Sequence, residues 1–187
     1  MVAVAIADET EPQRIARALR RKDPDVIDGL VSQYHYRLLR YLTFLTSRRE
    51  HAEDLVQETW LRVLERAWQY NGSSRFEPWL FAIARNLAMD DLRKRQRTGS
   101  QAEGEMAEES DSPFRAAARS EDAMRISAAL GALEPIYREA LLLRFQEDLS
   151  LAEIAEVAGA PVATVSSRIQ RGLAMLRGGL EGNNNAI

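Results

Sequence analysis

The chain has 187 residues, of which 45% are hydrophobic and 28% charged, a globular composition that makes disorder throughout untenable. It contains no cysteine, which excludes disulfide bonds, thiolate zinc sites and thiol redox chemistry. The formal net charge of −3 is unevenly spread: residues 1–97 carry 17 Lys/Arg against 14 Asp/Glu, residues 98–122 carry 2 against 7, and residues 123–187 carry 6 against 7. An acidic central segment therefore masks a mildly basic first half, which keeps nucleic acid among the candidate ligands.

The N-terminal run 1–7 is apolar but short, lacks a basic flank and leads directly into Asp8 and Glu9, so it is a poor signal peptide. No later stretch approaches the roughly 20 apolar residues of a membrane span. The sequence therefore predicts a cytoplasmic protein that does not insert into a membrane.

The first half of the chain shows helical periodicity, with apolar residues at three- and four-residue steps. It predicts a short amphipathic helix near Pro12–Arg21 and longer helices over Pro24–Ser47, Glu50–Trp68 and Pro78–Arg97. A turn-rich loop with a polar tip, residues 70–77, separates the last two.

Residues 98–119 lack periodicity and are rich in Gly, Ser, Glu and Ala, which predicts a flexible acidic linker. Beyond it, helices are predicted at about 120–132, 135–147, 150–158 and 161–177. There is no strand pattern and no internal repeat. The fold class is therefore all-α, with two small helical domains, 1–97 and 120–187, joined by the linker.

The second domain contains a helix-turn-helix pattern. Ser150 and Glu153 form a capping box that starts one helix, and Gly159 tolerates the left-handed conformation that ends it. On the outward face of the next helix, side chains suited to phosphates and base edges gather, namely Thr164, Ser167, Arg168 and Arg171. A plain helical hairpin with solvated arginines is the alternative interpretation of this segment alone.

Three motifs follow one another in the sequence. The segment His51–Trp60 (HAEDLVQETW) and the segment Trp79–Arg93 (WLFAIARNLAMDDLR) resemble regions 2.2 and 2.4 of the extracytoplasmic-function (ECF) sigma factors of the sigma-70 family. Leu149–Leu176 resembles region 4.2 of the same family, and the order and spacing agree. The resemblance implies a transcription initiation factor that binds RNA polymerase core and directs it to promoters, without being an enzyme.

The helix in the region resembling 2.2 carries acidic and amide side chains on its outer face, which suits a basic helical surface. The resemblance implies that this helix docks on the polymerase largest subunit. The residues predicted for polymerase binding are Glu53, Asp54, Leu55, Gln57 and Glu58.

The region resembling 2.4 implies recognition and opening of the minus-ten promoter element. The loop resembles the family's loop that captures an unstacked base, Asn86 and Asp90 lie four apart on one helical face, and a basic run follows that suits phosphates. The residues predicted to contact minus-ten DNA are Tyr70, Asn71, Ser73, Ser74, Arg75, Phe76, Asn86, Asp90, Arg93, Lys94, Arg95 and Arg97. The three tryptophans, Trp60, Trp68 and Trp79, are interpreted as core residues.

The region resembling 4.2 implies binding of the minus-thirty-five element. The residues predicted for this contact are Thr164, Ser166, Ser167, Arg168 and Arg171. Three positions depart from the family pattern. His51 and Ser166 stand where acidic and basic residues are frequent, and Gly172 stands where a helix former is frequent, which predicts a less rigid recognition helix.

Two other function classes are less consistent with the sequence. Catalysis is disfavoured, since adjacent carboxylates such as Asp90 and Asp91 diverge on a helix and there is no glycine-rich phosphate loop. No catalytic residue, metal site, cofactor or small-molecule substrate is predicted. A helix-turn-helix regulator that acts without being a polymerase subunit is the alternative function, although no spare segment supplies dimerisation. The resemblance also implies an anti-sigma partner and a role in a stress or envelope response.

Overall fold

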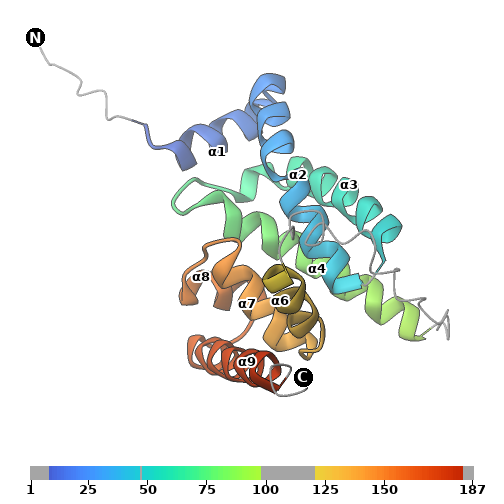
Figure 1. The fold of residues 1–187 in the computed structure, drawn as a ribbon. Helices are drawn as coiled ribbons and strands as arrows, with labels where there is room; N and C mark the ends of the chain where they lie inside the picture. The colour runs from blue at the N-terminus through green and yellow to red at the C-terminus, as the bar shows by residue number, and fades with distance from the viewer. Residues whose placement is uncertain (1–8, 47, 98–120, 183–187) are drawn as a thin grey trace, which may run out of the picture.

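The computed structural model describes residues 9–46, 48–97 and 121–182, and within these ranges all regular structure is helical (Figure 1). The predicted linker 98–119 lies outside the described residues, as do the two ends of the chain. The all-helical prediction is thus confirmed for the described parts. None of the described helices combines the length and apolar character needed to cross a bilayer.

The first half of the chain forms four α-helices and one 3-10 turn, which are α1 (Glu11–Arg21), α2 (Pro24–Thr46), α3 (Arg49–Glu65), η1 (Ala67–Gln69) and α4 (Phe76–Arg97). Helices α2, α3 and α4 pack together around fully buried side chains such as Leu38, Leu42, Val56, Val63 and Leu80. Each fully buried aliphatic side chain of this kind contributes roughly 1.5–3 kcal/mol relative to exposure.

The second half forms a smaller group of helices, which are α6 (Glu121–Gly131), α7 (Pro135–Phe145), α8 (Leu151–Ala158) and α9 (Val162–Gly182). Helix α9 packs on α6, α7 and α8. A Cβ atom at Gly172 would lie 3.1 Å from Cδ1 of Leu141, so the glycine allows α9 to approach α7 closely. Helix α9 continues unbroken past Gly172, and the residue that departs from the family pattern therefore has a packing role.

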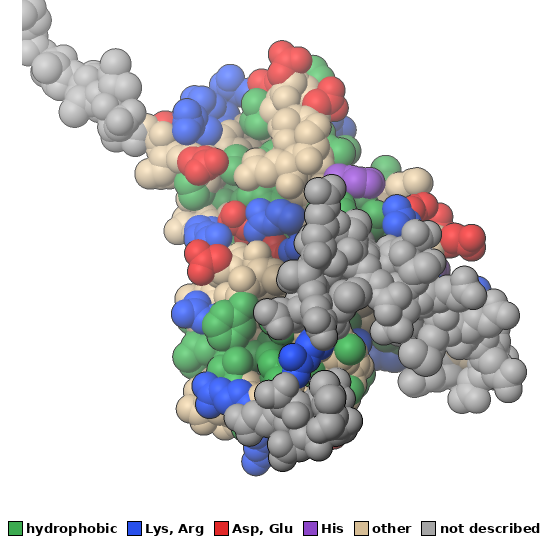
Figure 2. Space-filling view, viewed as in Figure 1, with side chains coloured by type: hydrophobic (Ala, Val, Ile, Leu, Met, Phe, Trp, Pro, Cys, Tyr) green, Lys and Arg blue, Asp and Glu red, His purple; other side chains and the backbone are tan. Residues whose placement is uncertain are grey.

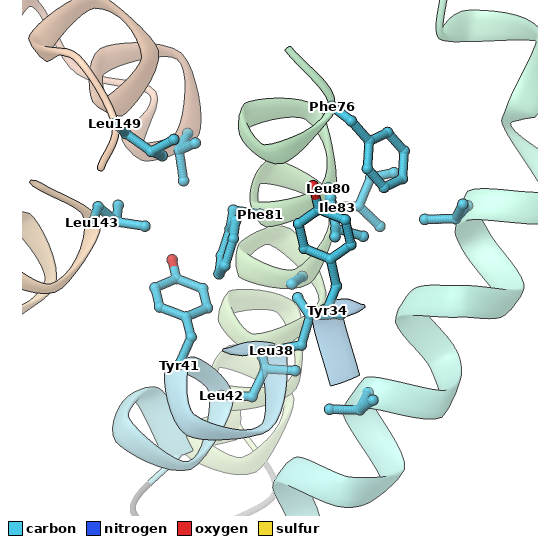
Figure 3. Close-up of a cluster of buried hydrophobic side chains, with 14 of the residues drawn as sticks. Tyr34, Leu38, Tyr41, Leu42, Phe76, Leu80, Phe81, Ile83, Leu143 and Leu149 are labelled. Atoms are coloured by element: carbon cyan, nitrogen blue, oxygen red, sulfur yellow. The ribbon is translucent and has the colours of Figure 1, made fainter. Parts of the chain in front are cut away.

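The two groups of helices also pack against each other, with α7 and α8 lying along α2 and α4 (Figure 1). Figure 3 shows Leu143 and Leu149 of the second group facing Tyr41 and Phe81 of the first. All four side chains are at most 2% exposed and belong to one continuous apolar core. This contact between the two halves was not predicted from the sequence.

The predicted helix order is confirmed, with small differences in where helices begin and end. Helix α4 begins at Phe76, two residues before Pro78, and α9 extends to Gly182. The interpretation of Trp68 as a core residue is wrong, because its side chain is 72% exposed. Helix α3 ends at Glu65, and the 3-10 turn that follows changes the direction in which Trp68 projects. Trp60 is buried and Trp79 packs partly buried against the core, as predicted.

Candidate nucleic-acid interface

The loop between η1 and α4 is a closed, polar turn. The Tyr70 hydroxyl donates to the Ser74 carbonyl at 2.7 Å, and the Ser73 N–H donates to Oδ1 of Asn71 at 2.9 Å. Gly72 has a φ of +74°, in the left-handed region that favours glycine. The tip residues Asn71, Ser73 and Ser74 are exposed. Hydrogen bonds within the loop thus fix its backbone, and the polar side chains at its tip face the solvent.

The aromatic residues that flank the loop pack in the core beside it. Tyr70 and Phe76, both predicted to contact minus-ten DNA, are only 3% and 2% exposed, so the structure places them in the core. Their rings meet edge to face with centroids 5.4 Å apart, and Trp79 stacks on Tyr70 at 5.2 Å. Burial, followed by the charges of Glu77 and Glu11, raises the pKa of Tyr70 to about 12, which keeps its hydroxyl a donor at neutral pH.

Helix α1 packs against the loop, which could not be predicted from the sequence. Arg20 donates to the Tyr70 carbonyl at 3.1 Å. A Cβ atom at Gly72 would lie 2.7 Å from both the Gln13 Cα and the Pro12 carbonyl oxygen, so only glycine lets α1 approach so closely. The first turn of α1 and the loop are therefore fitted to each other backbone to backbone.

Glu77, in the first turn of α4, ties the loop to α2. It accepts a hydrogen bond from the Tyr34 hydroxyl at 3.0 Å and pairs with Arg75 at 3.4 Å. Burial raises the pKa of the Glu77 carboxyl, but its own backbone N–H, Tyr34 and Arg75 outweigh burial and lower the pKa below its ordinary value. Glu77 is thus a charged anchor at neutral pH and was also missed by the sequence analysis.

Two predicted DNA contacts, Asn86 and Asp90, are exposed on the same face of α4. Asp90 accepts a hydrogen bond from Arg93 at 2.8 Å. Asn86 lies ten residues beyond Phe76, which at the helical rise is about 15 Å along the axis from the loop. The loop and Asn86 are therefore well separated along α4 and do not line a single pocket together.

The C-terminal end of α4 is basic, with Arg93, Lys94 and Arg97 exposed and Arg95 partly so. Arg95 pairs with Asp91 at 2.8 Å. Asp91 also contacts Nε2 of His51 at 2.7 Å, so His51 links the start of α3 to α4. This contact gives a structural reason for the histidine that departs from the family pattern.

The outer face of α3 exposes Glu53, Asp54 and Gln57, with Glu58 partly exposed. Glu53 pairs with Arg49 at 3.2 Å, and Glu58 pairs with Arg62 at 2.9 Å. Leu55, also predicted for polymerase binding, is 7% exposed and belongs to the core, because its position turns it inward on the helix. The face that remains is acidic and polar, as the sequence predicted.

The helix-turn-helix forms as predicted. The Ser150 N–H donates to Glu153 at 2.7 Å, the Glu153 N–H donates to the Ser150 hydroxyl at 3.3 Å, and Gly159 ends α8 with a φ of +59°. Val165 and Ile169 hold α9 on the core. The side chains predicted for DNA contact, Thr164, Ser166, Ser167, Arg168 and Arg171, are all at least partly exposed.

Comparison with known proteins agrees with this geometry. Residues 30–98 match the family model Sigma-70 region 2, and residues 123–176 match the model Sigma-70, region 4. The RNA polymerase sigma-H factor of Pseudomonas aeruginosa is 31% identical over 174 residues, covering 87% of this chain and 90% of that protein. This chain is an ECF sigma factor of the sigma-70 family.

Two further relatives support the assignment. The ECF RNA polymerase sigma factor SigE of Mycolicibacterium smegmatis is 36% identical over 154 residues, which cover 80% of this chain but only 60% of that protein. The solved structure of the sigma factor RpoE of Bartonella quintana with the anti-sigma factor NepR is similar in fold, with a TM-score of 0.66 and 25% identity. The structural similarity covers 82% of this sigma factor and 96% of RpoE.

Membership of this family bears on two predictions. Sigma factors are not enzymes, in agreement with the sequence-based exclusion of catalysis. The presence of both regions in one chain also disfavours the alternative of a regulator that acts without polymerase.

The fit between α1 and the loop gives a first prediction. Gly72→Ala should destabilise the protein by about 1 kcal/mol or more, because alanine is strained at this φ and its Cβ would overlap the α1 backbone. The midpoint of urea unfolding measures the change. Gly29→Ala, in an exposed turn of α2 with open space around it, is the matched control and should stabilise by about 0.5–1 kcal/mol. A Gly72→Ala midpoint equal to that of the wild type would contradict the fit.

Proposed function

We propose that this sigma factor binds RNA polymerase core through the first domain (1–97), captures minus-ten DNA with the loop and α4, and binds the minus-thirty-five element with the second domain (120–187). Residues 98–119 serve as a flexible acidic linker between them. One observation carries the proposal: the loop and the outer face of α9 are exposed, while the residues that support them are buried. Leu55, Tyr70 and Phe76 are left out of the contact sets because they are buried.

The acidic face of α3 is the proposed polymerase-binding surface. Asp54→Lys should weaken binding of core polymerase by about tenfold or more, because a positive charge would meet a basic partner surface. A pull-down or titration with purified core measures the effect. Asp28→Lys, an equally exposed charge reversal on α2, is the control and should bind normally. Unchanged binding by Asp54→Lys, with helicity intact, would remove this surface from the proposal.

The outer face of α9 is the proposed minus-thirty-five surface. Loss of a specific base contact by Arg168→Ala or Arg171→Ala should cost about 1–3 kcal/mol of discrimination. Loss of a phosphate contact should weaken all sequences alike and reduce the salt dependence. Footprinting of the polymerase complex across salt concentrations separates the two cases. Arg177→Ala, an exposed change nearer the end of the same helix, is the control. Wild-type footprints for both variants at every salt concentration would contradict the assignment.

Strand opening is assigned to the loop and to Asn86. An unstacked base has its hydrogen-bonding edge free, so an exposed amide on a rigid helix can bind that edge and stabilise the opened strand. Strand opening of this kind does not consume ATP. Asn86→Ala should leave polymerase binding intact but reduce open-complex formation on duplex promoters, measured by permanganate reactivity of thymines. Transcription by Asn86→Ala should partly recover on a template that is mismatched over the minus-ten element, because the strands of that template are already separated there. Equal opening of the duplex by variant and wild type would leave Asn86 with a structural role only.

An anti-sigma factor is the proposed inhibitor of this protein, with a stress or envelope response as the setting. The support is the similarity to RpoE, whose structure was solved with the anti-sigma factor NepR. Co-purification of the sigma factor from its own cells, with identification of the bound proteins, tests both partners at once. If polymerase subunits are recovered without an inhibitor, polymerase binding is retained in the proposal and the anti-sigma factor is removed from it.

A further inference from the structure

Trp68 is the most exposed large apolar side chain among the described residues, and its backbone is held firmly. In the 3-10 turn that carries it, Ala67 is 6% exposed, and Tyr70, which follows the turn, is 3% exposed. The Gln69 N–H donates to the Arg66 carbonyl at 2.8 Å and closes the turn. Because buried residues lie on both sides of Trp68 in the chain, the turn is fixed while 72% of the indole side chain meets solvent.

Helix α1, which packs on η1, exposes a basic face. The helix and its C-cap contain five basic residues against one acid, Glu11. The apolar side of α1 is buried in the core, and Figure 2 shows Lys and Arg side chains gathered over this helix. All five basic side chains are exposed, namely Arg14, Arg17, Arg20, Arg21 and Lys22. Arg17 pairs with Glu9 at 2.6 Å, whereas Arg14 and Arg21 have no ion-pair partner within the part of the chain that the structure describes.

This basic face is joined to the loop that is proposed to capture minus-ten DNA. The Arg20 guanidinium donates to the Tyr70 carbonyl at 3.1 Å, and the backbone at Gln13 lies against Gly72 in the loop. Figure 1 shows α4 running from the loop away from α1, so the basic end of α4 and the basic face of α1 lie on opposite sides of the loop. A DNA strand that passes along α4 and over the loop therefore reaches α1 and η1 next.

Basic side chains beside an exposed aromatic ring are the combination that binds single-stranded nucleic acid. The basic groups hold the phosphates, and an unpaired base stacks on the ring. In duplex DNA the faces of the bases are covered by their neighbours, so the ligand that suits Trp68 is the opened strand. Helix α1 lies outside residues 30–98, which match the region 2 family model, so that match assigns no function to its basic face.

We propose that Trp68 and the basic face of α1 form a second binding site for the opened promoter strand, next to the base that the loop captures. Trp68 stacks on one unpaired base, and Arg14 and Arg21 bind phosphates close to it. The site lengthens the stretch of single strand that the sigma factor holds and so stabilises the open complex. This inference rests on the proposed assignment of the loop to minus-ten DNA.

A double-mutant cycle between protein and DNA tests the stacked base. Holoenzyme, formed from the full chain and core polymerase, is titrated with a fluorescent single strand that carries the minus-ten element and several nucleotides on each side. An abasic site is moved along the flanks, and at one position it should weaken wild-type binding by about fivefold to a hundredfold. Trp68→Ala should weaken binding of the intact strand by a similar factor and show no further loss at that position. Losses that simply combine at every position would overturn stacking on Trp68.

Two variants show whether the aromatic ring itself is responsible. Trp68→Phe keeps a ring that can stack and should recover most of the affinity that Trp68→Ala loses. Phe145→Ala removes a side chain that is 62% exposed on the second domain, and as the matched control it should bind the strand as the wild type does. Urea unfolding verifies that each variant stays folded. Trp68→Phe binding as weakly as Trp68→Ala would contradict a stacking role.

The salt dependence of binding tests the basic face. Each lost phosphate contact lowers the slope of log affinity against log salt by about 0.7 for a single strand. Arg14→Gln and Arg21→Gln should each reduce the slope, whereas Trp68→Ala should weaken binding and leave the slope unchanged. Arg177→Gln, an exposed arginine of the second domain, is the control and should keep the wild-type slope. Wild-type slopes for both α1 variants would remove the phosphate contacts from the proposal.

Two further measurements distinguish this site from a protein contact and from the proposed function. The Trp68 and α1 variants should bind core polymerase as the wild type does. Weaker binding of core together with unchanged binding of the strand would make this surface a protein contact and overturn the proposal. Wild-type holoenzyme that binds minus-ten and scrambled strands equally well would refute the proposed function itself. A wild-type preference for the minus-ten strand that Trp68→Ala retains at full affinity would refute only the second site.

Discussion

Helix α4 is packed on two sides, and the positions of the functional surfaces depend on this. Leu80 and Ala84 are fully buried in the core that α4 shares with α2 and α3. Phe81 meets the ring of Tyr41 edge to face at 5.2 Å, and Arg85, one turn later, pairs with Glu139 of the second domain. The side that remains exposed carries Asn86 and, at its end, the basic run. A helix held in this way has little freedom to rotate, so its exposed side is fixed by what is buried.

The two sides of α4 differ in the chemistry of their contacts, because only the side that faces the second domain adds buried charged pairs to its apolar packing. Apolar packing within the first domain has no alternative partner except water, and its loss costs about 25 cal/mol for each Å² exposed. The charged groups of Glu139 and Glu147 regain hydration when the domains part, so the net energy of such pairs is small compared with the cost of removing one partner. Separation of the domains would also expose Leu143, Leu149 and Phe81 to water, so the charged pairs specify the geometry of the interface and the apolar side chains add to its stability.

Local features were predictable from the sequence, and long-range ones were not. The capping box of Ser150 and Glu153 and the turn at Gly159 form within a few residues, so the pattern alone predicts them. Trp68 was assigned wrongly because the 3-10 turn after Glu65 breaks the helical period. An aromatic residue beside a polar loop is compatible with stacking on a base or with packing in a core. Only the contacts of Tyr70 and Phe76 with Trp79 decide between these.

The buried carboxylates show the same limit more sharply. On the sequence, Glu139 and Glu147 resemble the solvated acids of any amphipathic helix, because their partners Tyr41 and Arg37 lie about 100 residues away. Their burial depends on a contact between domains that no local periodicity encodes. The candidate DNA-binding faces were predictable because family motifs mark them. The contact between the two domains carries no motif.

The covalent connection explains why a reversible contact can still hold the molecule closed. Two domains joined in one chain meet at an effective concentration that is in the millimolar range for short linkers. An interface with a dissociation constant of about 1 mM between separate domains, worth only about 4 kcal/mol, would then be roughly half closed within one chain. Each further factor of ten in affinity costs only about 1.4 kcal/mol, which is within the range of one hydrogen bond to a charged group.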